Sequence, residues 1–515
     1  MGSGVTVSGN KHELFMLASI SVYSAVFSYF TYLKHMSFLS YAWDLGTFDQ
    51  IMYSSVFAGK PFYYSADLFM NGSGNYLAIH FSPILALLFP IYYVAPDIST
   101  LLVIKSVAIG AAAYPLFRIA RRLTCSDTTA LCIGLVYLLN PGIHGANWFD
   151  FQPQSLAPLL IFATYYLLIA KRWAYYFPAL TLTLMIEEHV TLVVLLLLMS
   201  QLIHSRRGDL KRLLDLGLRE NQVLLISVVL CLASYGASAA MKAVYPIRPE
   251  FRDVYAASSA FGVLGYGGDV LSALIRAILD PQAALGALTH DSSLKLLYML
   301  MLFASLLFVP FLSGFLAVNA LIVVPFMLSN YRPYYMIGSH YPLYFMPSLF
   351  IMYAYAVSRL KERGTGVAKA ALITSTVIIA ALSPVSPLAG ALNQRSHFLW
   401  YTEAEPPGQG EAIHLLLSQV PSDASILTQN DVFPHVSSRT EAYVLHVLSF
   451  DRDQTRMVED YVDSLINHVE YVLLDTTTTD QWTTYARGRL EGSVDHVAMR
   501  VSSAVLYLRT KSGQG

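Results

Sequence analysis

The sequence predicts a polytopic α-helical membrane protein that carries a small α/β domain after its last membrane helix. Of its 515 residues, 55% are hydrophobic and only 13% are charged, about half the charged fraction of a soluble globular protein. The mean hydropathy is +0.49, and apolar runs of membrane length recur as far as residue 382. After that point the chain becomes polar and contains short β-rich runs.

Composition also argues against several classes of protein. The net charge of −1 offers no basic surface for a nucleic acid. Cys125, Cys132 and Cys231 lie in or beside apolar runs, and we expect small buried hydrophobic residues rather than disulfides or metal ligands. The N-terminal segment 1–13 lacks the basic stretch of a cleaved signal, so we expect the first apolar run to remain as a membrane span.

The first spans follow from length and charge. A span needs about 20 apolar residues, and Leu14–Leu33 and Ile98–Phe117 meet this length. The run between them, Phe81–Val94, is shorter and contains prolines, so we interpret it as a re-entrant or interfacial segment. With the N-terminus in the cytoplasm, the basic run Arg118–Arg122 then falls on the cytoplasmic side, where Lys and Arg concentrate.

Further apolar runs continue this alternation and bring the predicted number of transmembrane helices to about eleven. These runs are Thr128–Asn140, Ser155–Ala170, Ala174–Ile186, Val190–Ile203, Val223–Val244, Leu294–Phe311, Phe315–Leu328, Tyr341–Val357 and Val367–Leu382. The alternation places the C-terminal domain on the extracytoplasmic side of the cell membrane.

Two adjacent acids decide how the stretch Ala174–Ile203 folds. As one helix it would be about 45 Å long, with Glu187 and Glu188 near its middle. Each carboxylate at the centre of a bilayer costs about 2.5–3.5 kcal/mol. Two shorter helices that meet at Glu187–His189 avoid that cost, so we predict a break there.

We predict two domains, a transmembrane domain over residues 1–390 and an extracytoplasmic α/β domain over residues 391–515. The outer loops of the first domain are predicted at residues 34–97, 141–154, 245–293 and 329–340, and the third contains an amphipathic stretch, Val270–Leu279. In the second domain, helical stretches at Glu411–Gln419 and Glu459–Asn467 alternate with β-rich runs. These runs are Ala424–Thr428, Tyr443–Val447, Tyr471–Leu474, Ala498–Val501 and Val505–Leu508.

The predicted outer loops collect acids and histidines at one membrane face. The set comprises Asp44, Asp49, Asp67, His80, His144, Asp150, Glu187, Glu188, His189, Arg332 and His340. Ionisable groups where a bilayer boundary meets a helix bundle are candidates for a functional site. A single loop acid is more often simply hydrated, but two adjacent acids between apolar runs, Glu187 and Glu188, are harder to explain in that way.

The acids suit the transfer of a sugar from a lipid phosphate to a hydroxyl group. A carboxylate near the acceptor hydroxyl can act as a general base, and we assign this catalytic role to Asp44. Asp150 and either Glu187 or Glu188 are expected to support it. Alternatively, Asp44 and Asp150 hold a divalent metal, Mg²⁺ or Mn²⁺, because oxygen ligands suit hard cations.

The leaving phosphate needs positive charge. We expect His80, Arg332 and His340 to face it. Tyr341 follows His340 in the chain and completes the set of expected substrate-binding residues.

Five motifs occur in an order and at a spacing that resemble a known family. They are Trp43-Asp-Leu-Gly-Thr-Phe-Asp-Gln50, His80-Phe-Ser-Pro83, Trp148-Phe-Asp-Phe-Gln-Pro153, Glu187-Glu188 and His340-Tyr-Pro-Leu-Tyr-Phe-Met-Pro347. The pattern resembles the GT-C glycosyltransferase superfamily and, more closely, the predicted polytopic membrane proteins of domain-of-unknown-function family 2079. Pro421–Ser425 and Val472–Asp475 also fit that family's C-terminal part, whereas Ile186 and Gln152 stand where its pattern has Lys and His.

The resemblance implies a GT-C-like fold and the transfer of a sugar from a polyprenyl-phosphate-linked donor to an unknown acceptor at the extracytoplasmic face. Asp44 matches the first-loop acid that serves as base or metal ligand in GT-C enzymes. Asp150 falls where a second acid often lies in that superfamily.

Two other functions compete with the glycosyltransferase hypothesis. A transporter or lipid flippase predicts broken helices at matched positions of two halves and a site at the membrane midplane. A non-catalytic scaffold predicts that the outer-loop acids can be replaced without effect. The sequence has no internal symmetry and gathers its acids at one edge, so we favour the enzyme.

Overall fold

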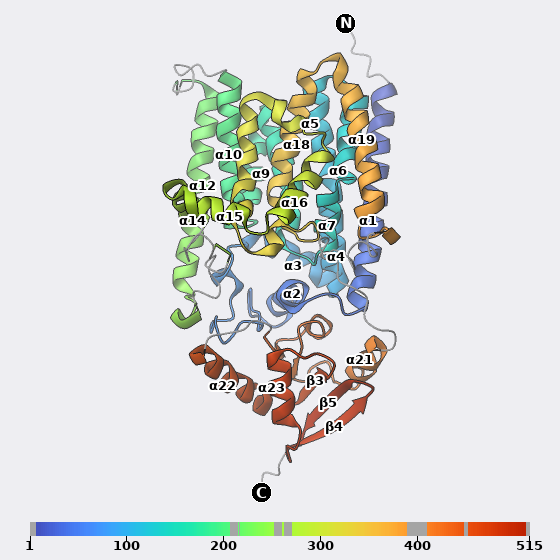
Figure 1. Ribbon diagram of the computed structural model, residues 1–515, viewed down its shortest axis with the longest axis vertical. Coiled ribbons are helices and arrows are strands. Elements are labelled where there is room, and N and C mark those ends of the chain that lie inside the picture. Colours follow the sequence, from blue (N-terminus) through green and yellow to red (C-terminus); the bar gives the residue numbers. More distant parts are fainter. Residues whose placement is uncertain are drawn as a thin grey trace.

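The computed structural model describes residues 7–206, 215, 217–251, 260–261, 270–388, 409–446 and 452–510. A bundle of helices forms the N-terminal part of the protein, and a sheet flanked by helices forms its C-terminal part (Figure 1). The predicted domain boundary at residue 390 falls in the segment 389–408, outside the described residues.

Five helical segments among the described residues are long and apolar enough to cross a membrane. They are α1 (Val7–Met36), α4 (Ile98–Ala111) continued by α5 (Ala113–Thr124), α10 (Glu188–Arg206), α12 (Arg219–Val244) and α19 (Glu362–Leu382). A sixth is counted if α6 (Asp127–Leu138) and α7 (Pro141–Trp148), which meet at 43°, form one bent span. The predicted number of about eleven therefore stays a prediction.

The other helices of this part are shorter. They are α2 (Thr47–Phe57), α3 (Phe89–Val94), α8 (Ala157–Ile169), α9 (Trp173–Leu184), α14 (Val270–Leu279), α15 (Pro281–Thr289), α16 (Ser292–Ala304), α17 (Val324–Leu328) and α18 (Pro342–Arg359). Helix α14 occupies the stretch predicted to be amphipathic. The apolar run Phe81–Val94 forms a short helical segment, as do three of the runs predicted to span the membrane, so its re-entrant interpretation stays a prediction.

Helix α18 is the central helix of the bundle. Every residue from Pro342 to Val357 is buried, the pattern of a helix enclosed on all sides. It packs against α5, α7, α8, α10 and α19. Because α18 begins directly after His340 and Tyr341, both residues lie at the end of the buried helix and are partly buried.

The predicted break at Glu187–His189 is confirmed. Helix α9 ends at Leu184, and α10 begins at Glu188. The two helices pack against each other, so the chain folds back at this point. Both acids therefore lie at the end of a helix instead of in the middle of a long one, as the cost of burying carboxylates in a bilayer predicts.

The C-terminal part contains a five-stranded sheet in the order β2-β1-β3-β5-β4. Its elements are α21 (Gln409–Leu417), β1 (Ile426–Thr428), β2 (Ala442–Val444), α22 (Arg452–His468), β3 (Tyr471–Asp475), α23 (Gln481–Leu490), β4 (His496–Val501) and β5 (Ala504–Arg509). Strands β2, β1 and β3 are parallel, and β5 runs antiparallel to β3 and β4. Each strand overlaps one of the five β-rich runs, so that prediction is confirmed.

The first loop and the C-terminal part share one hydrophobic core. Helix α2 lies between the bundle and the sheet domain (Figure 1), and Phe48 is buried in the same cluster as Ile426 and Phe433. A side chain at Gly46 would lie 2.6 Å from the ring of Phe433, so glycine is needed for this close approach. The packing holds the loop that carries Asp44 against the C-terminal part.

Asp49 fixes the same contact through hydrogen bonds. Its Oδ1 accepts from the hydroxyl of Tyr92 (2.6 Å), and its Oδ2 accepts from the hydroxyls of Ser437 (2.7 Å) and Ser438 (2.8 Å). The side chain is fully buried. Asp49 therefore joins two parts of the chain, and these contacts give it a structural role.

Replacing Asp49 by Ala should loosen the C-terminal part from the bundle. Three hydroxyl donors would lose their acceptor, and we expect the free energy of unfolding to fall by about 2–4 kcal/mol. Thermal unfolding and limited proteolysis of the purified protein measure this loss. Asp423→Ala, at an exposed carboxylate of the C-terminal part, is the control variant. Equal loss of stability in the two variants would contradict the anchoring role of Asp49.

Candidate functional site

Asp44 lies in a single π-helical turn, Ala42–Gly46, between α1 and α2. The backbone N–H of Gly46 donates to the carbonyl oxygen of Tyr41 (3.2 Å), five residues back, so the turn holds one residue more than an α-helical turn. The carboxylate of Asp44 accepts a hydrogen bond from Nε2 of Gln152, in the segment after α7. Two of the predicted outer loops therefore meet at Asp44.

Asp150 forms a buried ion pair beside this turn. Nζ of Lys34, in the last turn of α1, lies 2.7 Å from Oδ1 of Asp150, and the two side chains are 5% and 2% exposed. The backbone N–H of Tyr41 donates to Oδ2 of the same carboxylate (2.8 Å). Both oxygens of Asp150 thus have partners, and the ion pair connects α1 with the segment after α7.

The ion pair competes with the metal predicted between Asp44 and Asp150. An ion bound to both carboxylates would have to displace the ammonium group of Lys34 from Asp150. The predicted Mg²⁺ or Mn²⁺ role of the pair therefore stays a prediction, and we derive no step through such an ion.

Burial raises the pKa of Asp44, and the nearby carboxylate of Asp150 raises it further. The charge of Lys34 and the hydrogen bond from Gln152 lower it in part, and the result is a pKa of about 7. A carboxylate that titrates near neutral pH can both accept and release a proton under physiological conditions.

A second group of charged side chains lies at the junction of α9 and α10. Nδ1 of His80 is 2.9 Å from Oε1 of Glu187 and 3.5 Å from Oε1 of Glu188, and Nε2 of His189 is 3.9 Å from Oε1 of Glu187. Nζ of Lys242, on α12, is 2.6 Å from Oε1 of Glu188. One ligand atom from each histidine and each glutamate lies within 4.8 Å of the other three.

The second oxygen of each glutamate is held by a neutral donor. Oε2 of Glu187 accepts from the hydroxyl of Tyr344 and from Nε2 of Gln154. Oε2 of Glu188 accepts from the backbone N–H of Phe81 (2.8 Å). Glu187 and Glu188 are 1% and 4% exposed, so both carboxylates are fixed in the interior.

The charges of the Asp44 group and of the His80–Glu187–Glu188–His189 group both affect nearby side chains. Burial lowers the pKa of His80, but Glu187 and Glu188 outweigh it and raise the pKa to about 10, so the ring is positively charged at neutral pH. Burial raises the pKa of Tyr341 well above its usual value, and both Asp44 and Glu187 raise it further. Both carboxylates therefore act electrostatically on Tyr341, and its role as a substrate-binding residue stays a prediction.

His340 is partly buried, and its ring is uncharged at neutral pH. Burial lowers its pKa to about 4, with Glu187 acting in the opposite direction. The ring lies beside those of Phe149 and Tyr341, with centroid distances of 4.8 and 4.1 Å. A neutral His340 can offer a hydrogen bond to a phosphate but no charge.

The structure places two of the loop residues elsewhere. Arg332 is 67% exposed on its side chain, and its Nε lies 2.9 Å from Oδ2 of Asp291. His144 is buried, and its ring nitrogens contact the hydroxyl of Ser383 and the carbonyl oxygen of Leu138. None of these contacts includes Asp44 or Glu187.

Sequence reasoning missed Lys105. Its side chain is 1% exposed, and Nζ donates to the backbone carbonyl of Phe149, next to Asp150. The signal was available, because Lys105 is the one lysine within the apolar run Ile98–Phe117 and an intramembrane charge marks a functional site by default.

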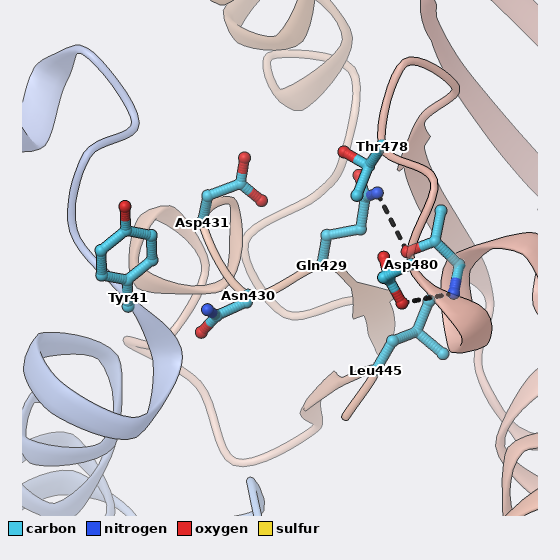
Figure 2. Close-up of a pocket in the computed structure, with 8 residues that line it drawn as sticks. Tyr41, Gln429, Asn430, Asp431, Leu445, Thr478 and Asp480 are labelled. Atoms are coloured by element: carbon cyan, nitrogen blue, oxygen red, sulfur yellow. Dashed lines mark hydrogen bonds between the residues drawn. The ribbon is translucent and has the colours of Figure 1, made fainter. Parts of the chain in front are cut away.

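A pocket of about 200 Å³ opens between the first loop and the C-terminal part (Figure 2). Tyr41 lines one side, and residues that follow the parallel strands β1, β2 and β3 line the rest. The lining residues are Tyr41, Gln429, Asn430, Asp431, Leu445, Thr478, Asp480 and Thr483. The carboxyl ends of parallel strands are a common place for ligands.

The chain belongs to the family described as "Predicted membrane protein (DUF2079)", which it matches over residues 34–496. No curated protein matches the sequence. Among solved structures, the archaeal oligosaccharyltransferase AglB from Archaeoglobus fulgidus, in complex with an inhibitory peptide and a dolichol-phosphate, is similar. The identity is 12% and the TM-score 0.39, over 96% of this chain and 74% of that chain. The family resemblance predicted from the motifs is confirmed.

The raised pKa of Asp44 predicts how stability depends on pH. The fold favours the protonated carboxyl, so the stability of the wild type should fall as the pH rises from about 4 to about 7 and then level off. Asp44→Asn removes this cost and should be more stable than the wild type above pH 7, by up to about 4 kcal/mol, but not near pH 4.

Thermal unfolding of the purified protein between pH 4 and pH 9 measures this difference. Asp423→Asn, at an exposed position, is the matched control and should show no such growth with pH. A stability difference between Asp44→Asn and the wild type that is the same at every pH would refute the raised pKa.

Proposed function

We propose, from its place in a family of membrane proteins and from this site, that the protein is a GT-C-type membrane glycosyltransferase. It would transfer a sugar from a polyprenyl-phosphate-linked donor to an acceptor at the extracytoplasmic face. The observation that supports this most directly is Asp44, a carboxylate with a pKa of about 7 in the turn Ala42–Gly46, which is hydrogen-bonded to Asn430 of the C-terminal part.

In this proposal Asp44 is the general base. It takes the proton of an acceptor hydroxyl while that oxygen attacks the anomeric carbon of the sugar. The bond from the anomeric carbon to the phosphate oxygen breaks, and the lipid phosphate leaves with the electron pair. Gln152 orients the carboxylate, and the opposed charges of Asp150 and Lys34 keep its pKa in the useful range.

The leaving phosphate would meet the second group of charges. His80 is positively charged, and both His80 and His189 are partly exposed, 36% and 45% on their side chains, so a ligand can reach them. Tyr341, whose ring lies beside that of His340 with a centroid distance of 4.1 Å, would contact the donor. Arg332 pairs with Asp291, outside both charged groups, and its role toward the phosphate stays a prediction.

The acceptor would enter through the pocket beside Tyr41. The lining offers carboxylate, amide and hydroxyl groups, which suit an acceptor rich in hydroxyls. Tyr41 also donates its backbone N–H to Asp150, so the pocket adjoins the base.

Turnover of lipid-phosphate sugars by the purified protein tests this proposal. Release of lipid phosphate is followed for a panel of polyprenyl-phosphate sugars, with water or added sugars as acceptors. Asp44→Asn should lower kcat by about 100-fold or more, because a general base contributes that much. The wild-type rate should rise with pH through about 7, as Asp44 ionises.

Asp423→Asn is the control and should retain the wild-type rate. Full turnover by Asp44→Asn would remove Asp44 from the mechanism. A wild-type protein that neither binds nor cleaves any donor of the panel would count against the enzyme and in favour of a transporter or scaffold.

A further inference from the structure

We propose that His80, Glu187, Glu188 and His189 bind one divalent transition-metal ion of the Zn²⁺ type. The sequence indicated no metal at these positions. The proposal rests on the convergence of four ligand atoms, on the hydrogen bonds behind them and on the charge that they bury.

The distances between the ligand atoms suit a tetrahedral ion. Bonds from Zn²⁺ to nitrogen or oxygen are about 2.0–2.2 Å, which separates the ligand atoms of a tetrahedral site by roughly 3.3–3.6 Å. The distances from His80 to Glu187 and Glu188 are 2.9 and 3.5 Å, and that from His189 to Glu187 is 3.9 Å. All four ligand atoms lie within 4.8 Å of one another, so shifts of up to about an ångström would bring them around one ion.

The ligands already have the supporting contacts of a metal site. Tyr344 and Gln154 hold Oε2 of Glu187, and the N–H of Phe81 holds Oε2 of Glu188. These bonds leave both Oε1 atoms facing Nδ1 of His80. Nδ1 itself is enclosed and makes no well-directed hydrogen bond among the described residues. Outer partners of this kind orient the ligands of metal sites.

The group also needs positive charge. Two adjacent carboxylates that are 1% and 4% exposed repel each other. At present the His80 ring and the ammonium of Lys242 compensate them. A divalent ion would take over this role if His80 lost its proton and Lys242, whose side chain is 39% exposed, moved into solvent.

The donor set selects the kind of metal. Two imidazole nitrogens and two carboxylate oxygens suit Zn²⁺ and its first-row neighbours, whereas Mg²⁺ and Ca²⁺ prefer oxygen alone. The ion differs in place and in type from the metal predicted at Asp44 and Asp150. If the proposed function holds, the ion would replace the charged His80 ring as the positive charge that faces the donor phosphate, since both histidines are reachable from outside.

Direct metal binding tests the proposal without any assay of turnover. The full-length purified protein is treated with a chelator, dialysed and titrated calorimetrically with ZnCl2 and with MgCl2. We expect one Zn²⁺ per chain and no comparable Mg²⁺ binding. His189→Ala and Glu187→Gln should each weaken Zn²⁺ binding by about 10-fold to 100-fold or more.

Two further variants separate a metal site from a simple ion-pair cluster. Lys242→Met removes the competing ammonium and should tighten Zn²⁺ binding by about fivefold. His290→Ala, at an exposed histidine outside the group, should leave binding unchanged. Lack of Zn²⁺ binding, or binding that survives in both His189→Ala and Glu187→Gln, would overturn the proposal. Zn²⁺ binding without donor turnover would refute the proposed function alone.

Discussion

The ion pair between Lys34 and Asp150 lies where the first helix leaves the bundle, and it is almost fully removed from solvent. A buried charge that loses its partner costs about 3–5 kcal/mol, so neither residue can move away alone. The same carboxylate holds the backbone of Tyr41. Through this one contact, the end of α1, the segment after α7 and the start of the Asp44 turn are fixed relative to one another.

The two charged groups of the site differ in how their charge is compensated. Glu187 and Glu188 each lie against a cation, and their remaining oxygens accept hydrogen bonds. Asp44 has only the neutral amide of Gln152 bonded to it among the described residues, since Lys34 pairs with Asp150. Burial and the neighbouring carboxylate of Asp150 therefore raise the pKa of Asp44, with only partial compensation from Lys34 and Gln152, and a pKa near neutral is the property that a general base needs.

Local sequence patterns predicted the strands and the helix break well, but they did not predict which side chains contact one another. The β-rich runs and the break at Glu187 depend on neighbouring residues, so the sequence alone contained the signal. That His80 joins Glu187 and Glu188 depends on how segments about a hundred residues apart pack. The same holds for Asp49, which looked like any loop acid until Ser437 and Ser438 came into contact with it. The guanidinium of Arg332 is suited to bind phosphate, but in the structure it forms an ion pair with Asp291, a contact that the sequence did not indicate.

The C-terminal part is attached to the very loop that carries the proposed base. Asp49 and Gln50 bind it through hydrogen bonds, and the N–H of Ala42 donates to Asn430, which also lines the pocket. The contacts on both sides of Asp44 are therefore made with the C-terminal part. A ligand that moved Asn430 would act on the turn holding Asp44 with no flexible segment between them. One hydrogen-bonded backbone turn, Ala42–Gly46, therefore connects the pocket with the proposed base.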